Sequence, residues 1–232
     1  MVLRQETMNP LIAKAFISLA VLMGIMAALI LFPAGTSDFW QAWIFLGVYC
    51  ACSLAITLYL MRKDPKLLQR RMSGGPIAEK NPTQKIIMIL ATLSFAGLLV
   101  VPGLDHRFGW SHLSVANEIV GDALVILGFL GVARVFKENS FTSATIEVAE
   151  DQRVISTGPY AHVRHPMYAA ALIMILGIPI ALGSYVAVIC FVTMVAVVVW
   201  RLLDEEQYLA ANLPGYAEYR RHVRFRLIPG VW

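Results

Sequence analysis

Charged and aromatic side chains gather in the last third of the chain, on either side of a long apolar run. Such groups are costly to desolvate beside an apolar region, so they mark a candidate functional site. They offer cations, carboxylates and aromatic rings together, which are the groups that would bind a polar ligand. The candidate residues are Tyr160, Arg164, His165, Tyr168, Arg201, Glu205 and Glu206.

Two prolines indicate how the first four of these residues are placed. Pro159 and Pro166 lie at the two ends of a short segment just before the long apolar run, and proline disfavours continuous helix. A turn here would bring its polar side chains to one place. Arg201 and Glu205 are four residues apart, which puts them on one face of a helix. That spacing is also typical of a simple surface ion pair, and a lone histidine before proline is often only a turn residue.

The composition indicates a membrane protein. Hydrophobic residues make up 58% of the chain, charged residues 15%, and the mean hydropathy is +0.67. Each apolar residue at a helix centre favours insertion by about 0.3–0.6 kcal/mol, whereas a charge opposes it by about 3 kcal/mol. Four windows long enough to span a bilayer contain no Asp, Glu, Lys or Arg: residues 15–37, 39–61, 86–104 and 165–200.

The last of these windows is too long for one crossing, and Gly183-Ser184 interrupts it, which predicts a helical hairpin. A further apolar segment covers about residues 119–136. The expected fold is therefore all-α: a polytopic membrane bundle of about six transmembrane helices with a cytosolic helical segment at the C-terminus. A cleaved signal peptide is a competing interpretation of residues 1–32, but the apolar run exceeds a signal-peptide core.

The distribution of Lys and Arg predicts the orientation. With the N-terminus inside, 18 of the 19 basic residues lie on the cytosolic side and only Arg107 lies outside. Both termini are expected to be cytosolic, in the plasma membrane of a bacterium or the endoplasmic reticulum of a eukaryote. The net charge of +4 suits anionic lipid headgroups, so the bilayer is the expected partner and nucleic acid is not.

The chain divides into two predicted regions. Residues 1–138 hold the first four transmembrane helices and a basic loop, 62–85, that begins as a surface helix suited to headgroup anchoring. Residues 139–232 form the cofactor-binding and catalytic region, and 139–158 predict a small hairpin or an irregular lid. No metal site is implied, because all three cysteines lie inside predicted spans.

Several motifs in the second region resemble a known family, the isoprenylcysteine carboxyl methyltransferases, and the phospholipid methyltransferases are similar here. The resemblance covers about residues 139–232, and earlier in the chain only the hydropathy and the Asp64-Pro65-x-Leu67-Leu68 loop agree. The motifs are Gly158-Pro159-Tyr160, Arg164-His165-Pro166-x-Tyr168, Arg201, Glu205-Glu206, Tyr216-x-x-Tyr219 and Ile228-Pro229.

The resemblance implies an integral-membrane enzyme that uses S-adenosyl-L-methionine (SAM) and takes a lipophilic or prenylated substrate from the bilayer. The cofactor would lie at the cytosolic edge, between the last hairpin and the C-terminal segment. Arg201 and Glu205 would border the methyl-transfer centre. The residues that would bind the cofactor are Tyr160, Arg164, His165, Tyr168 and Glu206.

The residues leave the methyl acceptor open. A carboxylate is already nucleophilic and would be oriented by Arg201, whereas a thiol or a phospholipid amine would need a base, for which His165 or Glu205 is the candidate. A transporter or a noncatalytic membrane scaffold is the alternative from another class. Transporters place charges near the bilayer midplane, and here the polar groups gather at one edge.

Overall fold

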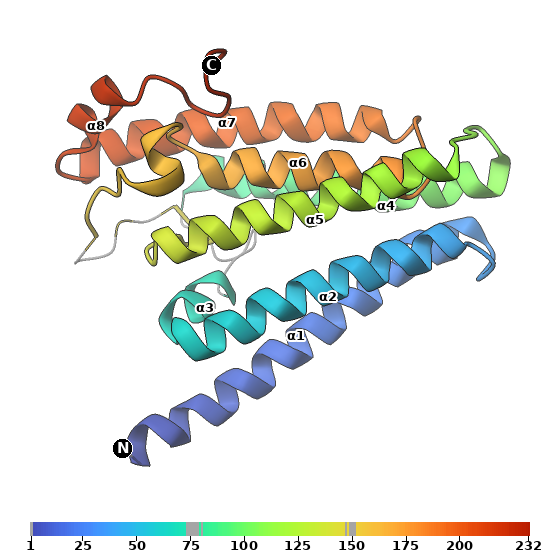
Figure 1. Cartoon of the computed structure of the whole chain (residues 1–232), viewed down its shortest axis with the longest axis horizontal. Helices are drawn as coiled ribbons and strands as arrows, with labels where there is room; N and C mark the ends of the chain where they lie inside the picture. The colour runs from blue at the N-terminus through green and yellow to red at the C-terminus, as the bar shows by residue number, and fades with distance from the viewer. Residues whose placement is uncertain (1, 73–78, 80, 147, 149–151) are drawn as a thin grey trace.

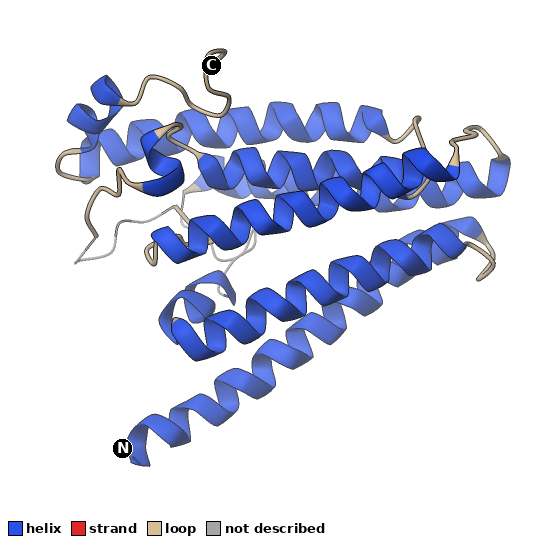
Figure 2. Ribbon diagram, in the orientation of Figure 1, coloured by secondary structure: helices blue, strands red, loops and turns tan. Residues whose placement is uncertain are grey.

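The computed structural model describes residues 2–72, 79, 81–146, 148 and 152–232, and over these ranges the chain is helical with no strand (Figure 2). The predicted all-α class is confirmed. The elements are α1 (Val2–Ala34), α2 (Trp40–Lys63), α3 (Pro65–Met72), α4 (Pro82–Phe108), α5 (Val115–Glu138), the 3-10 helix η1 (Gly158–Ala161), α6 (Pro166–Ala181), α7 (Val188–Asn212) and α8 (Tyr216–His222).

Six helices, α1, α2, α4, α5, α6 and α7, form a bundle in which successive helices alternate in direction. The shorter elements α3, η1 and α8 lie at one end of the bundle. The N-terminus, α3, η1 and α8 lie at the same end (Figure 1). The turns α1–α2, α4–α5 and α6–α7 lie at the opposite end. The basic segments singled out in the sequence are thereby brought together, as a bundle with alternating helix directions requires.

The chain is a multi-pass membrane protein. Residues Pro10–Ala34 of α1, and all of α2, α4 and α5, are long and apolar enough to cross a membrane. The predicted hairpin is present as α6 and α7, but α6 has only 16 residues and α7 bears charges in its C-terminal half. Length and composition therefore identify four of the six predicted spans, together with one shorter apolar helix.

The segment between α5 and η1 is irregular where the structure describes it. No strand forms between Asn139 and Ile146, so this part of the predicted hairpin is not seen; residues 147 and 149–151 lie outside the described residues. Local side-chain bonds hold the chain instead. Asn139 Oδ1 accepts a hydrogen bond from the Phe141 amide (2.9 Å), and Asn139 Nδ2 donates one to the Tyr160 hydroxyl (3.0 Å).

Glycines let α5 and α6 approach until their backbones touch. A Cβ on Gly128 would lie 2.4 Å from Cβ of Met174, and one on Gly121 would lie 2.1 Å from the Ala181 amide nitrogen. From the other side, a Cβ on Gly177 would lie 2.6 Å from the Gly121 carbonyl oxygen. Small residues allow such close packing of membrane helices. This contact fixes α6, and with it the site residues at the start of that helix.

Asp105 closes the opposite end of the bundle. It accepts hydrogen bonds from the Ser111 amide (2.6 Å), the Ser111 hydroxyl (2.5 Å) and the buried Ser184 hydroxyl. Ser184 lies in the turn between α6 and α7, so one carboxylate joins the end of α4 to that turn. The hairpin is held at both ends, since its other end contributes to the site described below.

The close contact between α5 and α6 predicts a large effect of a single methyl group. Gly128→Ala is expected to destabilise the protein by at least about 1–3 kcal/mol, because overpacking forces the backbones apart. Gly47→Ala on α2 is the control, since a Cβ there meets no atom within 4 Å. Thermal unfolding of both variants in detergent checks this: equal melting temperatures would contradict the packing argument.

Candidate active site

A cavity of about 710 Å³ is lined by residues of α3, η1 and α8 and of the longer helices, and six of the seven predicted site residues line it. They are Tyr160, Arg164, His165, Tyr168, Arg201 and Glu205. The predicted break in the helix is confirmed: η1 ends at Ala161 and α6 begins at Pro166. Glu206, the seventh residue, does not line the cavity but is buried behind it.

Glu206 is the centre of a buried ionic cluster. Its Oε1 accepts a hydrogen bond from Arg164 Nε (2.6 Å) and lies 3.2 Å from His165 Nε2, and its Oε2 accepts one from Arg226 Nε (3.2 Å). Burial by itself would raise the pKa of Glu206. Hydrogen bonds and positive charge from His165 and Arg164 have a larger, opposite effect and lower the pKa to about 2. The carboxylate is therefore ionised at neutral pH.

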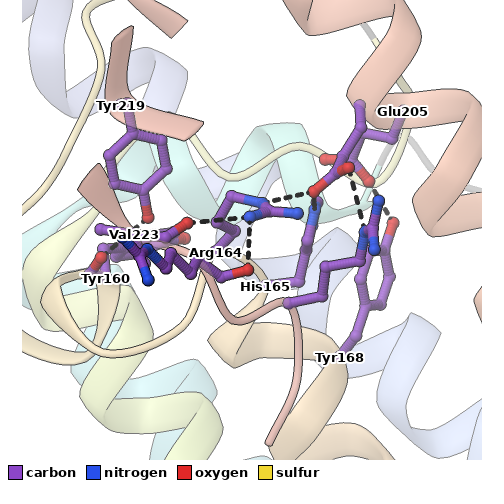
Figure 3. Close-up of polar contacts among 10 residues, drawn as sticks. Tyr160, Arg164, His165, Tyr168, Glu205, Tyr219 and Val223 are labelled. Carbon is purple, nitrogen blue, oxygen red and sulfur yellow. Dashed lines mark hydrogen bonds and ion pairs between the residues drawn. The ribbon is translucent and has the colours of Figure 1, made fainter. Parts of the chain in front are cut away.

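Arg164 fastens the C-terminal segment to the turn before α6 (Figure 3). Its Nη1 donates to the carbonyl oxygens of Val223 and Arg224, both at 2.8 Å. Its amide donates to the Phe225 carbonyl (2.9 Å), and the next amide, of His165, donates to the Arg226 carbonyl (2.9 Å). Most of the guanidinium's donors are thus used within the protein, and its charge is paired with Glu206.

Tyr168 connects the two residues expected at the methyl-transfer centre. Its hydroxyl donates to Glu205 Oε2 (2.5 Å) and accepts from Arg201 Nε (3.2 Å). The sequence allowed a direct pair between Arg201 and Glu205, but the ion pair that Arg201 makes is with Glu79, at 3.0 Å. Within the described part of the chain, Glu205 makes no ion pair, so it is the carboxylate that the cavity presents to a ligand.

The partners of Arg201 come from distant parts of the sequence. Glu79 is 3% exposed, and Gln84, at the start of α4, accepts a hydrogen bond from Arg201 Nη1 (3.0 Å). The amide of Gln84 also donates to Asp204, one helical turn beyond Arg201. A single acid in a basic loop, 122 residues from its partner, gives no local pattern that would reveal the contact.

Tyrosines form one wall of the cavity. Tyr219 donates from its hydroxyl to the Tyr160 carbonyl (2.8 Å), and burial raises the pKa of Tyr160 to about 12, so the phenol stays protonated. The Tyr216 hydroxyl is buried and makes no hydrogen bond to the residues that the structure describes. Tyr216 is a lining residue of the cavity, but its hydroxyl oxygen itself is buried. The Tyr216-x-x-Tyr219 motif was noticed in the sequence, but without a role.

The part of the cavity between the transmembrane helices is mostly apolar, with the hydroxyl residues Ser18, Ser53 and Thr57 among its lining. Its walls are Leu19 and Leu22 of α1, Ile56 of α2, Phe129 of α5 and Met174 of α6. One continuous space therefore joins a polar end, rich in charges and phenols, to a lipophilic interior. It can hold a polar ligand beside a lipophilic one.

Comparison with known proteins gives a consistent result. The phospholipid methyltransferase family profile matches residues 116–214, from α5 to the end of α7. Protein-S-isoprenylcysteine O-methyltransferase B of Arabidopsis thaliana is 28% identical over 146 residues, 60% of this chain and 70% of that protein. The Schizosaccharomyces pombe protein-S-isoprenylcysteine O-methyltransferase is 29% identical over 111 residues, 42% of this chain and 45% of its own length.

One further relative has a name that describes metal resistance and not methyl transfer. Cobalt-zinc-cadmium resistance protein CzcN of Cupriavidus metallidurans is 29% identical over 104 residues, 44% of this chain and 48% of that protein. The chain thus spans about half the length of this relative. Together, the profile over residues 116–214 and the relatives at 28–29% identity show that the chain is distantly related to the membrane methyltransferases, which include the phospholipid methyltransferases and the isoprenylcysteine O-methyltransferases.

Proposed function

We propose that the protein is a SAM-dependent methyltransferase that methylates the carboxylate of an isoprenylcysteine-like lipophilic acceptor at the cytosolic face of the membrane. The observation that carries this proposal is the single cavity with a polar end and an apolar interior. Such a space allows a charged methyl donor and a lipophilic acceptor to meet away from bulk water. Holding two reactants in line contributes up to about 7–11 kcal/mol to lowering the barrier.

The polar end fits the chemistry of SAM. The whole cavity, polar end and apolar interior together, has a volume of about 710 Å³, within the range of ligand pockets. The tyrosine wall suits the adenine ring and the sulfonium. Cofactor binding is assigned to Tyr160, His165 and Tyr168, with Arg164 and Glu206 holding the backbone turn around it.

Arg201 and Glu205 are assigned to the reaction centre. SAM supplies an electrophilic methyl group: the acceptor oxygen bonds to carbon while the carbon–sulfur bond breaks and sulfur leaves as a neutral thioether. Arg201 orients the acceptor, and its pairing with Glu79 keeps it from neutralising the nucleophile completely. Glu205, held by the Tyr168 hydroxyl, would act as the base if the acceptor were a thiol or an amine.

The proposed topology has six spans with both termini cytosolic. The apolar part of α7, residues 188–200, and the short α6 complete the four longer helices. The positive-inside rule supports this orientation, because the end of the bundle with α3, η1 and α8 carries the basic segments. The cavity then opens at the cytosolic surface.

Cofactor binding is expected to stabilise the purified protein. At a ligand concentration of 100 times Kd, SAM or its demethylated product S-adenosylhomocysteine should add about 2.7 kcal/mol to the free energy of unfolding. Thermal unfolding in detergent measures this. No shift at saturating ligand, in a folded sample, would favour a scaffold. A screen of labelled methyl transfer to prenylated thioacids, small thiols and phosphatidylethanolamine then identifies the acceptor.

A further inference from the structure

Arg71, in α3, is partly buried and differs from the other two arginines that line the cavity away from solvent, Arg164 and Arg201. Arg164 is paired with Glu206 and Arg201 with Glu79. Arg71 also lines the cavity, but it makes no ion pair with any carboxylate in the described ranges. Its Nη1 donates to the Ser143 carbonyl (2.9 Å), and its guanidinium lies 5.5 Å from the centre of the Phe136 ring.

The charge on Arg71 is therefore costly in the absence of a ligand. Burial lowers the pKa of Arg71, and the nearby charge of Arg201 lowers it further. A guanidinium nevertheless stays protonated in proteins, so the cost remains as desolvation of a cation that has no carboxylate partner among the described residues. An anion that entered the cavity would offset this desolvation cost. It would also accept hydrogen bonds from the guanidinium N–H groups of Arg71 that have no acceptor among the described residues.

The surroundings of Arg71 indicate which ligand would bring that anion. Helix α3 packs on α2 through the buried Leu67 and Leu68, which contact Leu60 and Phe136. Leu60, Leu68 and Phe136 also line the lipophilic part of the cavity. Figure 1 shows α3 and α8 on opposite sides of this end of the bundle.

We propose that Arg71 is the receptor for an anionic group, carboxylate or phosphate, on the lipophilic acceptor. This rests on the proposed function and deepens it: the acceptor is an anionic amphiphile whose chain lies between α1, α2 and α5. Arg71 binds its head beside the reaction centre, while Arg201, already paired with Glu79, orients the reacting atom.

Arg70 provides a matched control on the same helix. Its Nη1 donates to the Ser140 carbonyl (2.9 Å), and its guanidinium lies 5.7 Å from the centre of the Phe141 ring, so its contacts resemble those of Arg71. Unlike Arg71, it does not line the cavity. Arg70→Ala thus removes the same charge and the same kinds of contact without touching the site.

The test measures binding of three probes with one farnesyl chain to the full-length protein in detergent. The probes end in a thioether carboxylate, the matched primary amide, or a phosphate. The unaltered protein is expected to bind an anionic probe at least about tenfold more tightly than the amide. Arg71→Ala should remove this preference, Arg71→Lys should keep part of it, and Arg70→Ala should leave it unchanged. The tighter anionic probe identifies the head group.

Binding of S-adenosylhomocysteine to the same variants separates the possible failures. Unchanged affinity in all of them supports the proposal. If Arg71→Ala weakened S-adenosylhomocysteine binding and kept the preference for anionic probes, the residue would serve the cofactor and the inference would be wrong. Equal loss of preference in the Arg70 and Arg71 variants would also overturn it. Failure of the unaltered protein to bind S-adenosylhomocysteine, with the Arg71-dependent preference intact, would contradict only the proposed function.

Discussion

Arg201→Ala is expected to lower kcat by about 10²–10³-fold, the usual cost of removing one preorganised donor from a reaction centre. Binding of S-adenosylhomocysteine should be largely retained, because Tyr168 is the one assigned cofactor residue that Arg201 contacts and its hydroxyl keeps its hydrogen bond to Glu205 in the variant. Labelled methyl transfer measures the first effect, and ligand-induced stabilisation measures the second. Loss of cofactor binding in a folded variant would contradict the assigned roles.

The ion pair with Glu79 calls for a second variant. Removing Arg201 alone leaves a buried carboxylate without its partner, which costs about 3–5 kcal/mol and could reduce activity through unfolding. The double variant Glu79→Gln/Arg201→Ala removes that unpaired charge. It is expected to recover much of the lost thermal stability but none of the lost turnover. Recovery of turnover along with stability would make Arg201 a structural residue.

Glu206→Gln is expected to abolish measurable cofactor binding and to destabilise the protein by about 3–5 kcal/mol, as when one partner of a buried ion pair is removed. Arg164, 5% exposed at its side chain, would lose its counter-charge, and Arg226 and His165 would lose a shared acceptor. The turn before α6 and the C-terminal segment would then separate. Thermal unfolding with and without S-adenosylhomocysteine measures both effects.

The pKa of Glu206 gives this prediction a pH dependence. The pKa falls from its ordinary value of 4.5 to about 2 in the folded protein. The unfolded chain therefore binds the proton first, and the stability that Glu206 contributes is complete above pH 4.5 and is lost as the pH falls toward 2. The gap in melting temperature between the unaltered protein and Glu206→Gln should shrink over this interval.

A control substitution makes the pH test specific. Glu218→Gln, at an exposed position of α8, removes one carboxylate from the same region without touching the cluster. Its melting temperature should follow that of the unaltered protein at every pH. A pH-independent gap for Glu206→Gln, or the same behaviour in Glu218→Gln, would argue against the ionic cluster.

Local sequence patterns predicted the helices and the turn well. Apolar windows of spanning length located α1, α2, α4 and α5, and the two prolines located the break before α6. The grouping of site residues also followed, because a turn and a helix end at one edge of a bundle must meet. These features depend on neighbours in sequence, which is where periodicity and backbone restrictions act.

Contacts between distant segments could not be predicted in this way. No local pattern marks Glu79, which is the ion-pair partner of Arg201. Arg164 looked free to bind a ligand carboxylate, yet it holds the carbonyls of Val223 and Arg224. Pairing between segments depends on how the helices pack in three dimensions. Such contacts produce no periodic pattern in a single sequence, so they cannot be predicted from it. The assigned site roles remain proposals for the experiments above.

The shortness of α6 has a consequence for the surrounding lipid. Its 16 residues correspond to about 24 Å of helix, less than the roughly 30 Å of hydrocarbon in a typical bilayer. With α6 in a bilayer, this hydrophobic mismatch is relieved by local thinning. Lipid headgroups would then dip toward the start of α6, where Tyr168 and its neighbours lie. An amphiphile in this thinned part of the bilayer would need to move only a short distance out of the leaflet to reach the site.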